Sequence, residues 1–502
     1  MSQMAILPVL LPLLGAMAIL FAKMLNHKSQ QALSVLFVIM LIVINIVVLL
    51  DVLSVGHFVY QLGDWKAPFG ITFVLDSFSA IMLLLTSLLA LGALWYAVIR
   101  KIDGEGVNFH VLFHLQLFGL NGAFLTGDVF NLFVFFEVLL LASYALILHG
   151  FGKERTRFGM HYMIINLVGS TLFLFAVGTL YGILGTLNIA DMALQVSNLA
   201  ANDRGVVAAA GLLLLVVFGL KAAMFPLYFW LSGAYSSTSA PVAALFAIMT
   251  KVGIYSIIRV HGTIFGSEAG ALSFYHLPWV LGLGVITIIL AAFGVMSSKG
   301  LKEQIAYLVL ASVATLLIAI GINTPEALSG AIFYLMHSTL IAGGFFLYAG
   351  MLDTIRGEYS DRFVRTPSFK SIVLSGSIFF AFAVAILGMP PLSGFLGKMM
   401  ILSGALQSSY AWLVFSVILL VSILMIIALT RAGSLMFYHI KDDESSISNP
   451  ISFAVYYPIF YLFGLALMLV VFANPISEFT DQSALMLYDA AGYIDKVLVV
   501  GE

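Results

Sequence analysis

The stretch Met399–Thr430, MMILSGALQSSYAWLVFSVILLVSILMIIALT, runs without a single charged residue. A helix that crosses a bilayer needs only about 20 consecutive, mostly apolar residues. The whole chain of 502 residues has the same character, with 62% hydrophobic and 9% charged residues. Soluble domains carry about 25% charged residues. The sequence therefore predicts a polytopic membrane protein and excludes a soluble enzyme.

Net charge and cysteine content exclude further classes of protein. The formal net charge is −2, and no basic segment indicates a nucleic-acid partner. The chain has no cysteine, which excludes structural disulfides, iron–sulfur ligation and thiolate zinc sites. We expect no cofactor. The first apolar segment, Met4–Ala22, lacks a basic start and a cleavage site, so we expect a permanent span rather than a signal peptide.

Charged residues, prolines and glycines divide the chain into about fourteen apolar spans. Only helices and closed barrels satisfy their backbone polar groups in lipid, and uninterrupted apolar runs favour helices. We therefore expect an all-α membrane protein. The expected spans are residues 4–22, 32–54, 75–99, 109–126, 129–149, 158–186, 206–231, 240–262, 277–297, 303–322, 327–351, 369–407, 410–437 and 452–474. The twelfth exceeds one straight helix, and Pro390 and Pro391 are expected to break it.

The distribution of positive charge predicts the orientation. Of the 22 Lys and Arg residues, fifteen fall in loops after odd-numbered spans and three fall inside spans. The positive-inside rule then places the odd loops in the cytoplasm and both termini outside. Four fall in loops after even-numbered spans, namely Lys66, Arg204, Arg259 and Lys496. The longest polar connections are 55–74, with hairpin-like alternation, and the basic 353–370; neither is large enough for a catalytic domain.

Four charges lie deep within the expected spans, away from their ends, and a charge at bilayer depth costs at least about 2.5–3.5 kcal/mol. Glu137 stands in an apolar run and needs a cation to remain charged. Lys251 lies at the middle of the eighth span, and Lys221 and Lys398 lie in the seventh and twelfth. Polar residues that could line water around them are Thr171, Ser232, Ser236, Ser237, Thr238 and Ser312.

Two of these lysines stand beside proline-broken helices. Pro226 lacks an N–H, so the carbonyl of Ala222, next to Lys221, loses its helical partner. Lys398 follows the Pro390–Pro391 break in the same way. Paired discontinuous helices in two halves of a chain are typical of secondary transporters. The alternatives are that Lys398 snorkels to the interface and that the glycines and prolines serve only close helix packing.

Histidines add weaker signals. His337 lies in the middle of the eleventh span, where a charge switch near pH 7 would suit a proton relay, and a packing histidine fits the same position. His110 and His114 are spaced i, i+4 at a span end without acidic partners nearby in the sequence. No metal site is expected there.

The stretch KAAMFPLYFWL at 221–231, with the nearby APVAAL at 240–245 and KVGIY at 251–255, resembles a known signature. It is shared by Mrp-type cation/proton antiporters and the proton-pumping subunits of respiratory complex I. The motifs NLFVFFE at 131–137, GLKEQIAY at 300–307 and MPPLSGFLGK at 389–398 agree with it. The stretch GDWKAPFGI at 63–71 is similar to the Mrp type, and the length suits its D subunits.

This resemblance implies an architecture of fourteen helices with two inverted five-helix repeats and with helices 7 and 12 broken. Residues 1–108 would form helices 1–3 with an outward hairpin loop. Residues 109–262 would be the first repeat, helices 4–8, and residues 276–437 the second, helices 9–13. Residues 438–502 would form helix 14 and a tail.

The resemblance also implies a proton pathway across the membrane midplane. The implied roles are an ion pair between Glu137 and Lys221 that opens and closes, a proton carrier at Lys251, a relay at His337 and an exit at Lys398. One position departs from the family pattern, because many relatives have a Lys where this chain has Ala342. The second half of the pathway would then depend on the histidine and water.

The expected function is that of a proton-translocating subunit of a multisubunit sodium/proton antiporter in a bacterial or archaeal plasma membrane. Its partners would be the other antiporter subunits, protons, sodium ions and membrane lipid. The first alternative is an antiporter-like membrane subunit of a quinone-linked dehydrogenase complex of the complex I type. The second is a non-transporting scaffold within a larger assembly.

Overall fold

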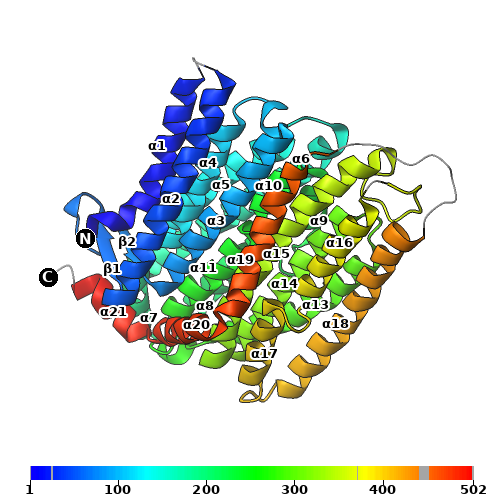
Figure 1. The fold of residues 1–502 in the computed structure, drawn as a ribbon. Coiled ribbons are helices and arrows are strands. Elements are labelled where there is room, and N and C mark those ends of the chain that lie inside the picture. Colours follow the sequence, from blue (N-terminus) through cyan, green and yellow to red (C-terminus); the bar gives the residue numbers. More distant parts are fainter. Residues whose placement is uncertain (1, 24–25, 370, 440–450, 500–502) are drawn as a thin grey trace.

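The computed structural model describes residues 2–23, 26–369, 371–439 and 451–499. Nearly all of the described chain is helical, and most helices run side by side in one bundle (Figure 1). In this part of the chain, twelve helices are long and apolar enough to cross a membrane. Two shorter apolar helices, α4 (Phe109–Leu125) and α16 (Ile372–Leu387), occupy the positions of the fourth and twelfth expected spans. The all-α membrane fold is confirmed, while the inverted repeats stay a prediction.

The N-terminal part contains the hairpin that the alternation at 55–74 predicts. Strands β1 (Phe58–Gln61) and β2 (Thr72–Leu75) pair antiparallel, with Phe58 opposite Leu75. Asp76 follows β2 and begins the next helix, because its carboxylate accepts a hydrogen bond from the Ser79 backbone N–H at 2.9 Å. The helices around the hairpin are α1 (Leu7–Ala22), α2 (His27–Val55) and α3 (Ser77–Arg100).

The middle of the chain contains the first broken helix. The seventh span is interrupted as predicted, since α8 (Arg204–Lys221) ends before Pro226 and α9 (Phe229–Ser237) begins after it. The end of α8 exposes the carbonyl of Leu220, which accepts a hydrogen bond from the Trp230 indole at 3.2 Å. The helices that precede this break are α5 (Val129–Leu148), α6 (Lys153–Leu184) and the short α7 (Ile189–Ser197).

The eighth span is also interrupted, which the sequence did not predict. It divides into α10 (Ala240–Phe246), α11 (Met249–Ser256), the π-helix η4 (Ile257–His261) and α12 (Gly262–Ile264). The gap between α10 and α11 contains neither proline nor glycine. α11 can pack closely against α8 because residue 253 is a glycine. Any larger residue would place its Cβ only 2.7 Å from the Phe218 carbonyl oxygen, which is too close. The two interrupted helices therefore pack backbone to backbone.

The second half contains the other predicted break. The twelfth span divides into α16 and α17 (Ser393–Ala405), on either side of Pro390 and Pro391. Glycines let α17 approach α15, since a Cβ at Gly397 would lie 2.9 Å from the Cβ of Tyr334. The remaining helices of this half are α13 (Leu277–Ser297), α14 (Leu301–Ile322), α15 (Pro325–Arg356), α18 (Ala411–Gly433), the π-helix η7 (Ser434–Tyr438) and α19 (Tyr456–Val471).

The C-terminal tail is more ordered than expected. It forms α20 (Ala473–Tyr488), which lies across the lower end of the bundle in Figure 1, and α21 (Ala490–Val499). Val497 and Ile494 of α21 pack with Val74 of the hairpin and Ala190 of α7. The short N-terminal helix η1 (Ser2–Ile6) contacts both strands as well. Both ends of the described chain therefore lie on one face of the bundle. The other short 3₁₀ helices are η2 (Leu62–Asp64), η3 (Ile102–Gly104), η5 (Gly270–Leu272), η6 (Gly357–Tyr359) and η8 (Phe453–Val455).

One positive charge is not where the sequence suggested. Arg259, assigned to a loop after the eighth span, is 4% exposed within the π-helix η4. Its guanidinium lies 2.5 Å from the Asp76 carboxylate, and this pairing explains how a charge is tolerated there. Two of the lysines counted in odd loops, Lys370 and Lys441, lie outside the described residues.

Candidate functional site

A chain of hydrogen bonds begins at the intramembrane carboxylate, Glu137 of α5. The Ser170 hydroxyl of α6 donates to this carboxylate, with the Asn166 carbonyl as its second acceptor at 3.1 Å. The Asn166 side-chain oxygen accepts a hydrogen bond from the Lys221 ammonium at 3.1 Å. Asn166 and Ser170 stand four residues apart and share one face of α6. Together they connect the acid of α5 to the base at the end of α8.

The expected ion pair between Glu137 and Lys221 is not closed in this arrangement. Within the described parts of the chain, no carboxylate oxygen lies within 4.0 Å of the Lys221 ammonium. The ring of Phe136 lies 5.7 Å from the ammonium and offers a cation–π contact. Lys221 is also the last residue of α8, where the unpaired carbonyls of a helix end favour a positive charge. The helix break thus compensates the buried ammonium, which is 8% exposed.

A small cavity lies between the two interrupted helices. It has a volume of about 20 Å³, enough for one water molecule. Lys221 and Asn166 line one part of it, and Met249 and Val252 of α11 line another. Lys251 lies between these two α11 residues in the sequence, but its own side chain does not line the cavity and bonds to α14 instead.

Lys251 is the most deeply buried charge of the site. It is 0% exposed, and its ammonium donates to the Ser312 hydroxyl of α14 at 3.1 Å. Ser312 is one of the polar residues that the sequence suggested near the buried charges, and it does contact a lysine. Thr171 does not: it is exposed, and its hydroxyl bonds to the carbonyl of Leu167 on its own helix.

The far side of α14 faces Lys398. A second cavity, of about 10 Å³, is lined by Thr315 of α14, Tyr334 of α15 and Lys398 of α17. The Lys398 ammonium donates to the Leu387 carbonyl, the last residue of α16, at 2.7 Å, and approaches the Ser422 hydroxyl at 3.4 Å. The Lys398 ammonium is thus held inside the helix break by the C-terminal end of α16, where the helix dipole favours a positive charge.

His337 of α15 is fully buried beside the same break. Its Nε2 donates to the Ala385 carbonyl at 3.0 Å, and its Nδ1 lies 2.7 Å from the Ser393 hydroxyl oxygen. The Ser393 hydroxyl also donates to the Ala466 carbonyl at 3.0 Å. All three bonds form together only when both ring nitrogens carry a proton, because serine has one hydrogen. With its single hydrogen, the Ser393 hydroxyl can donate either to the Ala466 carbonyl or to Nδ1 of a neutral His337 ring.

A wide groove lies on the face that carries the odd loops. Its volume is about 1030 Å³, and Gln304 of α14 is among its lining residues, together with Ser237 at the end of α9. Leu308 and Ser312 follow Gln304 at intervals of four residues, so one face of α14 leads from the groove to Lys251. The groove therefore opens on this face beside the helix that carries Ser312.

Several polar residues of the site were not found from the sequence. Asn166, Ser170 and Ser393 are among them, and so is the Asp76–Arg259 pair near the opposite face. The signal for the first two was the i, i+4 spacing on an otherwise apolar helix. The Arg259 guanidinium also bonds to the Tyr255 hydroxyl at 3.3 Å, one turn beyond Lys251 on the same helical face.

One expectation about histidines is wrong. His110 was expected to lack an acidic partner, but its Nε2 lies 3.0 Å from the Asp103 carboxylate oxygen. Asp103 precedes His110 by seven residues, and the loop after α3 folds back to bring them together. Sequence spacing alone does not show such a contact.

Comparisons with known proteins extend over nearly the whole chain. Residues 126–426 match the family described as "NADH:quinone oxidoreductase/Mrp antiporter, TM". The chain is 37% identical to the D subunit of a probable K⁺/H⁺ antiporter from Rhizobium meliloti, over 99% of this chain and 98% of that protein. It is 36% identical to the D subunit of a Na⁺/H⁺ antiporter from Alkalihalophilus pseudofirmus, over 99% and 100%. A chain in the structure of the Mrp complex from a Dietzia species shares 28% identity, with a TM-score of 0.87 over 99% of this chain and 100% of that chain.

Proposed function

The chain belongs to the NADH:quinone oxidoreductase/Mrp antiporter family of membrane proteins, and on that premise we propose that it carries protons within a multisubunit monovalent cation/proton antiporter. The relatives named above as D subunits of Na⁺/H⁺ and K⁺/H⁺ antiporters support this function. The cation exchanged for protons is sodium in this proposal, and its partners are the other subunits of an Mrp-type complex.

The observation that carries the proposal is the line of buried polar residues across the bundle. Glu137 is connected through Ser170 and Asn166 of α6 to Lys221, which lines a water-sized cavity together with α11. Lys251 of α11 bonds to Ser312 of α14, and Thr315 of the same helix lines a cavity with Lys398. Buried ionisable residues in a membrane are costly and mark ion and proton pathways. Both helix breaks lie beside a lysine of this set: Lys221 is the last residue of α8, and the Lys398 ammonium donates to the carbonyl at the end of α16.

Each member of the line has a role in the proposal. Closure of Glu137 onto Lys221 removes positive charge from the neighbourhood of Lys251, and opening returns it. Lys251 then takes up or releases a proton through the cavity and Ser312. His337 relays the proton by the rotation of Ser393, and Lys398 passes it out of the second half. Ala342 is buried in α15, so the histidine carries this step without a neighbouring lysine.

The second candidate is a membrane subunit of a proton-translocating dehydrogenase complex, which the family description also includes. It would use the same residues, driven by electron transfer instead of a sodium gradient. The two relatives named as antiporter subunits favour the first candidate, and the subunits that co-purify with this chain distinguish the two. Antiporter subunits alone are expected in the purified assembly.

Substitution of Lys251 tests the role of a proton carrier. Arginine keeps the positive charge but does not release a proton in proteins. Lys251→Arg should therefore stop cation-driven pH change in everted vesicles as completely as Lys251→Ala, per amount of assembled complex. Transport by the arginine variant at the wild-type rate would exclude Lys251 as the carrier. Thr179→Val, on the exposed side of α6, is the control and should transport normally.

The proposed location is the plasma membrane of a bacterium or archaeon, with the odd loops in the cytoplasm and both termini outside. The division into residues 1–108, 109–262, 276–437 and 438–502 is retained as the proposed domain organisation.

The proposed orientation can be tested by labelling. Because the chain has no cysteine, single cysteines introduced at Lys66 and Glu358 report the side on which each loop lies. An impermeant reagent should label the first from outside and the second from inside, and labelling of both from one side would contradict the proposed topology.

A further inference from the structure

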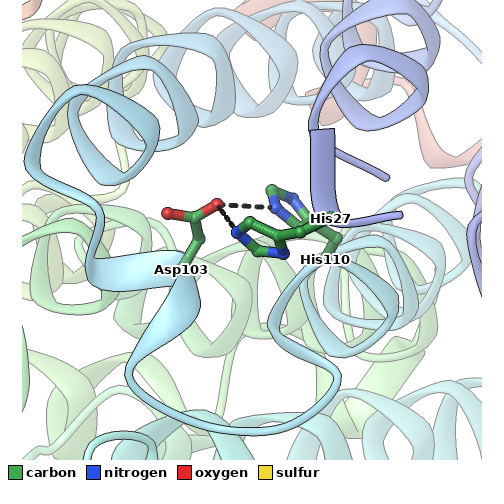
Figure 2. Close-up of side chains that lie close together, drawn as sticks. All are labelled: His27, Asp103 and His110. Carbon is green, nitrogen blue, oxygen red and sulfur yellow. Dashed lines mark hydrogen bonds and ion pairs between the residues drawn. The ribbon is translucent and has the colours of Figure 1, made fainter. Parts of the chain in front are cut away.

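Three side chains from separate segments converge at the odd-loop end of the bundle (Figure 2). His27 is the first residue of α2, Asp103 lies in η3 after α3, and His110 lies in the first turn of α4. The Asp103 oxygen Oδ2 is 3.0 Å from Nε2 of His27 and 3.0 Å from Nε2 of His110. The three ligand-type atoms all lie within 4.8 Å of one another.

Hydrogen bonding in this cluster is unevenly distributed. Oδ2 of Asp103 accepts a hydrogen bond from the Gln31 amide at 2.7 Å, is bonded to Nε2 of His110, and lies within ion-pair distance of Nε2 of His27. The other carboxylate oxygen, Oδ1, is buried and has no partner within the described residues. Three nitrogen atoms thus surround one oxygen of a carboxylate whose side chain is 0% exposed. A cation at the point where they converge would replace the competing donors and could also take the unused lone pairs.

We propose that His27, Asp103 and His110 form a binding site for a divalent transition-metal cation of the Zn²⁺ class. Two histidine nitrogens and one carboxylate oxygen are a ligand set that zinc accepts with water or a fourth side chain. Metal–ligand distances of about 2.0–2.2 Å in a tetrahedron separate the ligand atoms by about 3.4 Å. The two distances from Asp103 Oδ2, 3.0 Å each, need a small outward movement, and the two histidine nitrogens lie within 4.8 Å of each other.

The surroundings fit a site that exchanges metal with water. The His27 side chain is 49% exposed and gives access, while the side chains of Asp103 and His110 are 0% and 2% exposed. Burial raises the pKa of Asp103, but the hydrogen bonds from His110 and Gln31 lower it, so that the pKa lies below its usual value. Gln31, one turn after His27, stands close enough to complete the site with its amide oxygen after a flip.

Metal binding would fasten the α1–α2 hairpin to the rest of the bundle. The tip of this hairpin is held on the same side by a hydrogen bond from Lys23 to the Asn108 side chain, at 3.0 Å. A bound cation would join the start of α2, the loop after α3 and the start of α4 through three strong bonds. This role is independent of the proton pathway, because none of the three ligands belongs to it.

The test measures metal binding by the purified assembly that contains the full chain, after removal of metal by a chelator. Titration with Zn²⁺ and with Co²⁺ should show one additional equivalent bound to the wild type. The visible spectrum of Co²⁺ should report tetrahedral nitrogen and oxygen ligands, because this chain has no thiol. Loss of a residue that merely supports a ligand weakens metal binding about 10–100-fold, so loss of a ligand should weaken it at least tenfold.

The variants are Asp103→Asn, His110→Gln and His27→Gln, with His161→Gln on the exposed side of α6 as the matched control. Each of the first three should lose the equivalent and the Co²⁺ spectrum, and the control should keep both. His27 is half exposed, so its substitution tests the site even where the buried substitutions lower stability. Zn²⁺ should also raise the thermal unfolding midpoint of the wild type and not that of His27→Gln. Equal binding by the wild type and His27→Gln, or no bound equivalent in the wild type, would overturn the proposal.

Discussion

Asn166 offers the sharpest test of the hydrogen-bonded line, because it is the described acceptor of the Lys221 ammonium. The substitution is Asn166→Leu, which keeps the volume of the side chain and removes its oxygen. In the structure this oxygen lies 3.1 Å from the Lys221 ammonium, and Asn166 is 1% exposed. Water therefore has little access to replace the lost bond, apart from the cavity of about 20 Å³.

The size of the effect follows from the kind of bond removed. A hydrogen bond to a charged group contributes about 1.5–3 kcal/mol. At about 1.4 kcal/mol for each factor of ten, its loss disfavours the charged, correctly placed Lys221 by roughly 10- to 150-fold. Proton transport should fall by a comparable factor, provided that the lysine must be charged and in place once in each cycle.

The assay is cation-driven pH change in everted vesicles, divided by the amount of assembled complex. Asn166→Asp is the informative companion, because a carboxylate at the same distance would hold the lysine in a permanent ion pair. This variant should assemble as well as the wild type and transport poorly. Thr171→Val is the matched control on the exposed face of the same helix, where the hydroxyl bonds only to its own backbone. Wild-type transport by Asn166→Leu would refute the role of α6 in the line.

Two further predictions concern packing and the second buried ion pair. Gly394→Ala should lower the free energy of unfolding by about 1–3 kcal/mol and reduce transport, because the new Cβ would lie 2.5 Å from Nε2 of His337. Gly178→Ala is the control: it lies in open space on α6 and should be neutral or stabilising in the same thermal unfolding experiment. Arg259→Met should leave the buried Asp76 carboxylate unpaired, at a cost of about 3–5 kcal/mol. Adding Asp76→Asn, which keeps the helix cap, should recover much of that stability, and a double variant no more stable than Arg259→Met would contradict the pairing.

The breaks in the seventh and twelfth spans could be predicted because proline acts locally. Pro226 removes a backbone donor whatever surrounds it, and the same holds for Pro390 and Pro391. The interruption between Phe246 and Met249 could not be predicted, because no residue there opposes a helix. The close approach of α11 to α8 at Gly253 is a contact between separate segments of the chain, and it could not be predicted either.

The sequence also could not show which face of each helix points toward the inside of the bundle. In a soluble helix the apolar stripe marks the core, but in lipid both the inner and outer faces are apolar. The sequence therefore suggested Thr171 as a residue near the buried charges, whereas it is the neighbouring Ser170 that contacts the Glu137 carboxylate. The partners of Asp103 and Arg259 could not be assigned either, because each lies on an element that only packing brings close.

The sequence by itself determined the membrane class, the approximate spans, the hairpin and the two proline breaks. It did so because hydropathy and the backbone hydrogen-bonding of proline are properties of short segments. It also identified the buried charges, since each is costly wherever it stands in the bilayer. Only the tertiary structure decided which polar groups form hydrogen bonds or ion pairs with those charges. Hydrogen bonds act over about 3 Å, and helix rotation and packing alone bring residues as distant as Asn166 and Lys221 within that range.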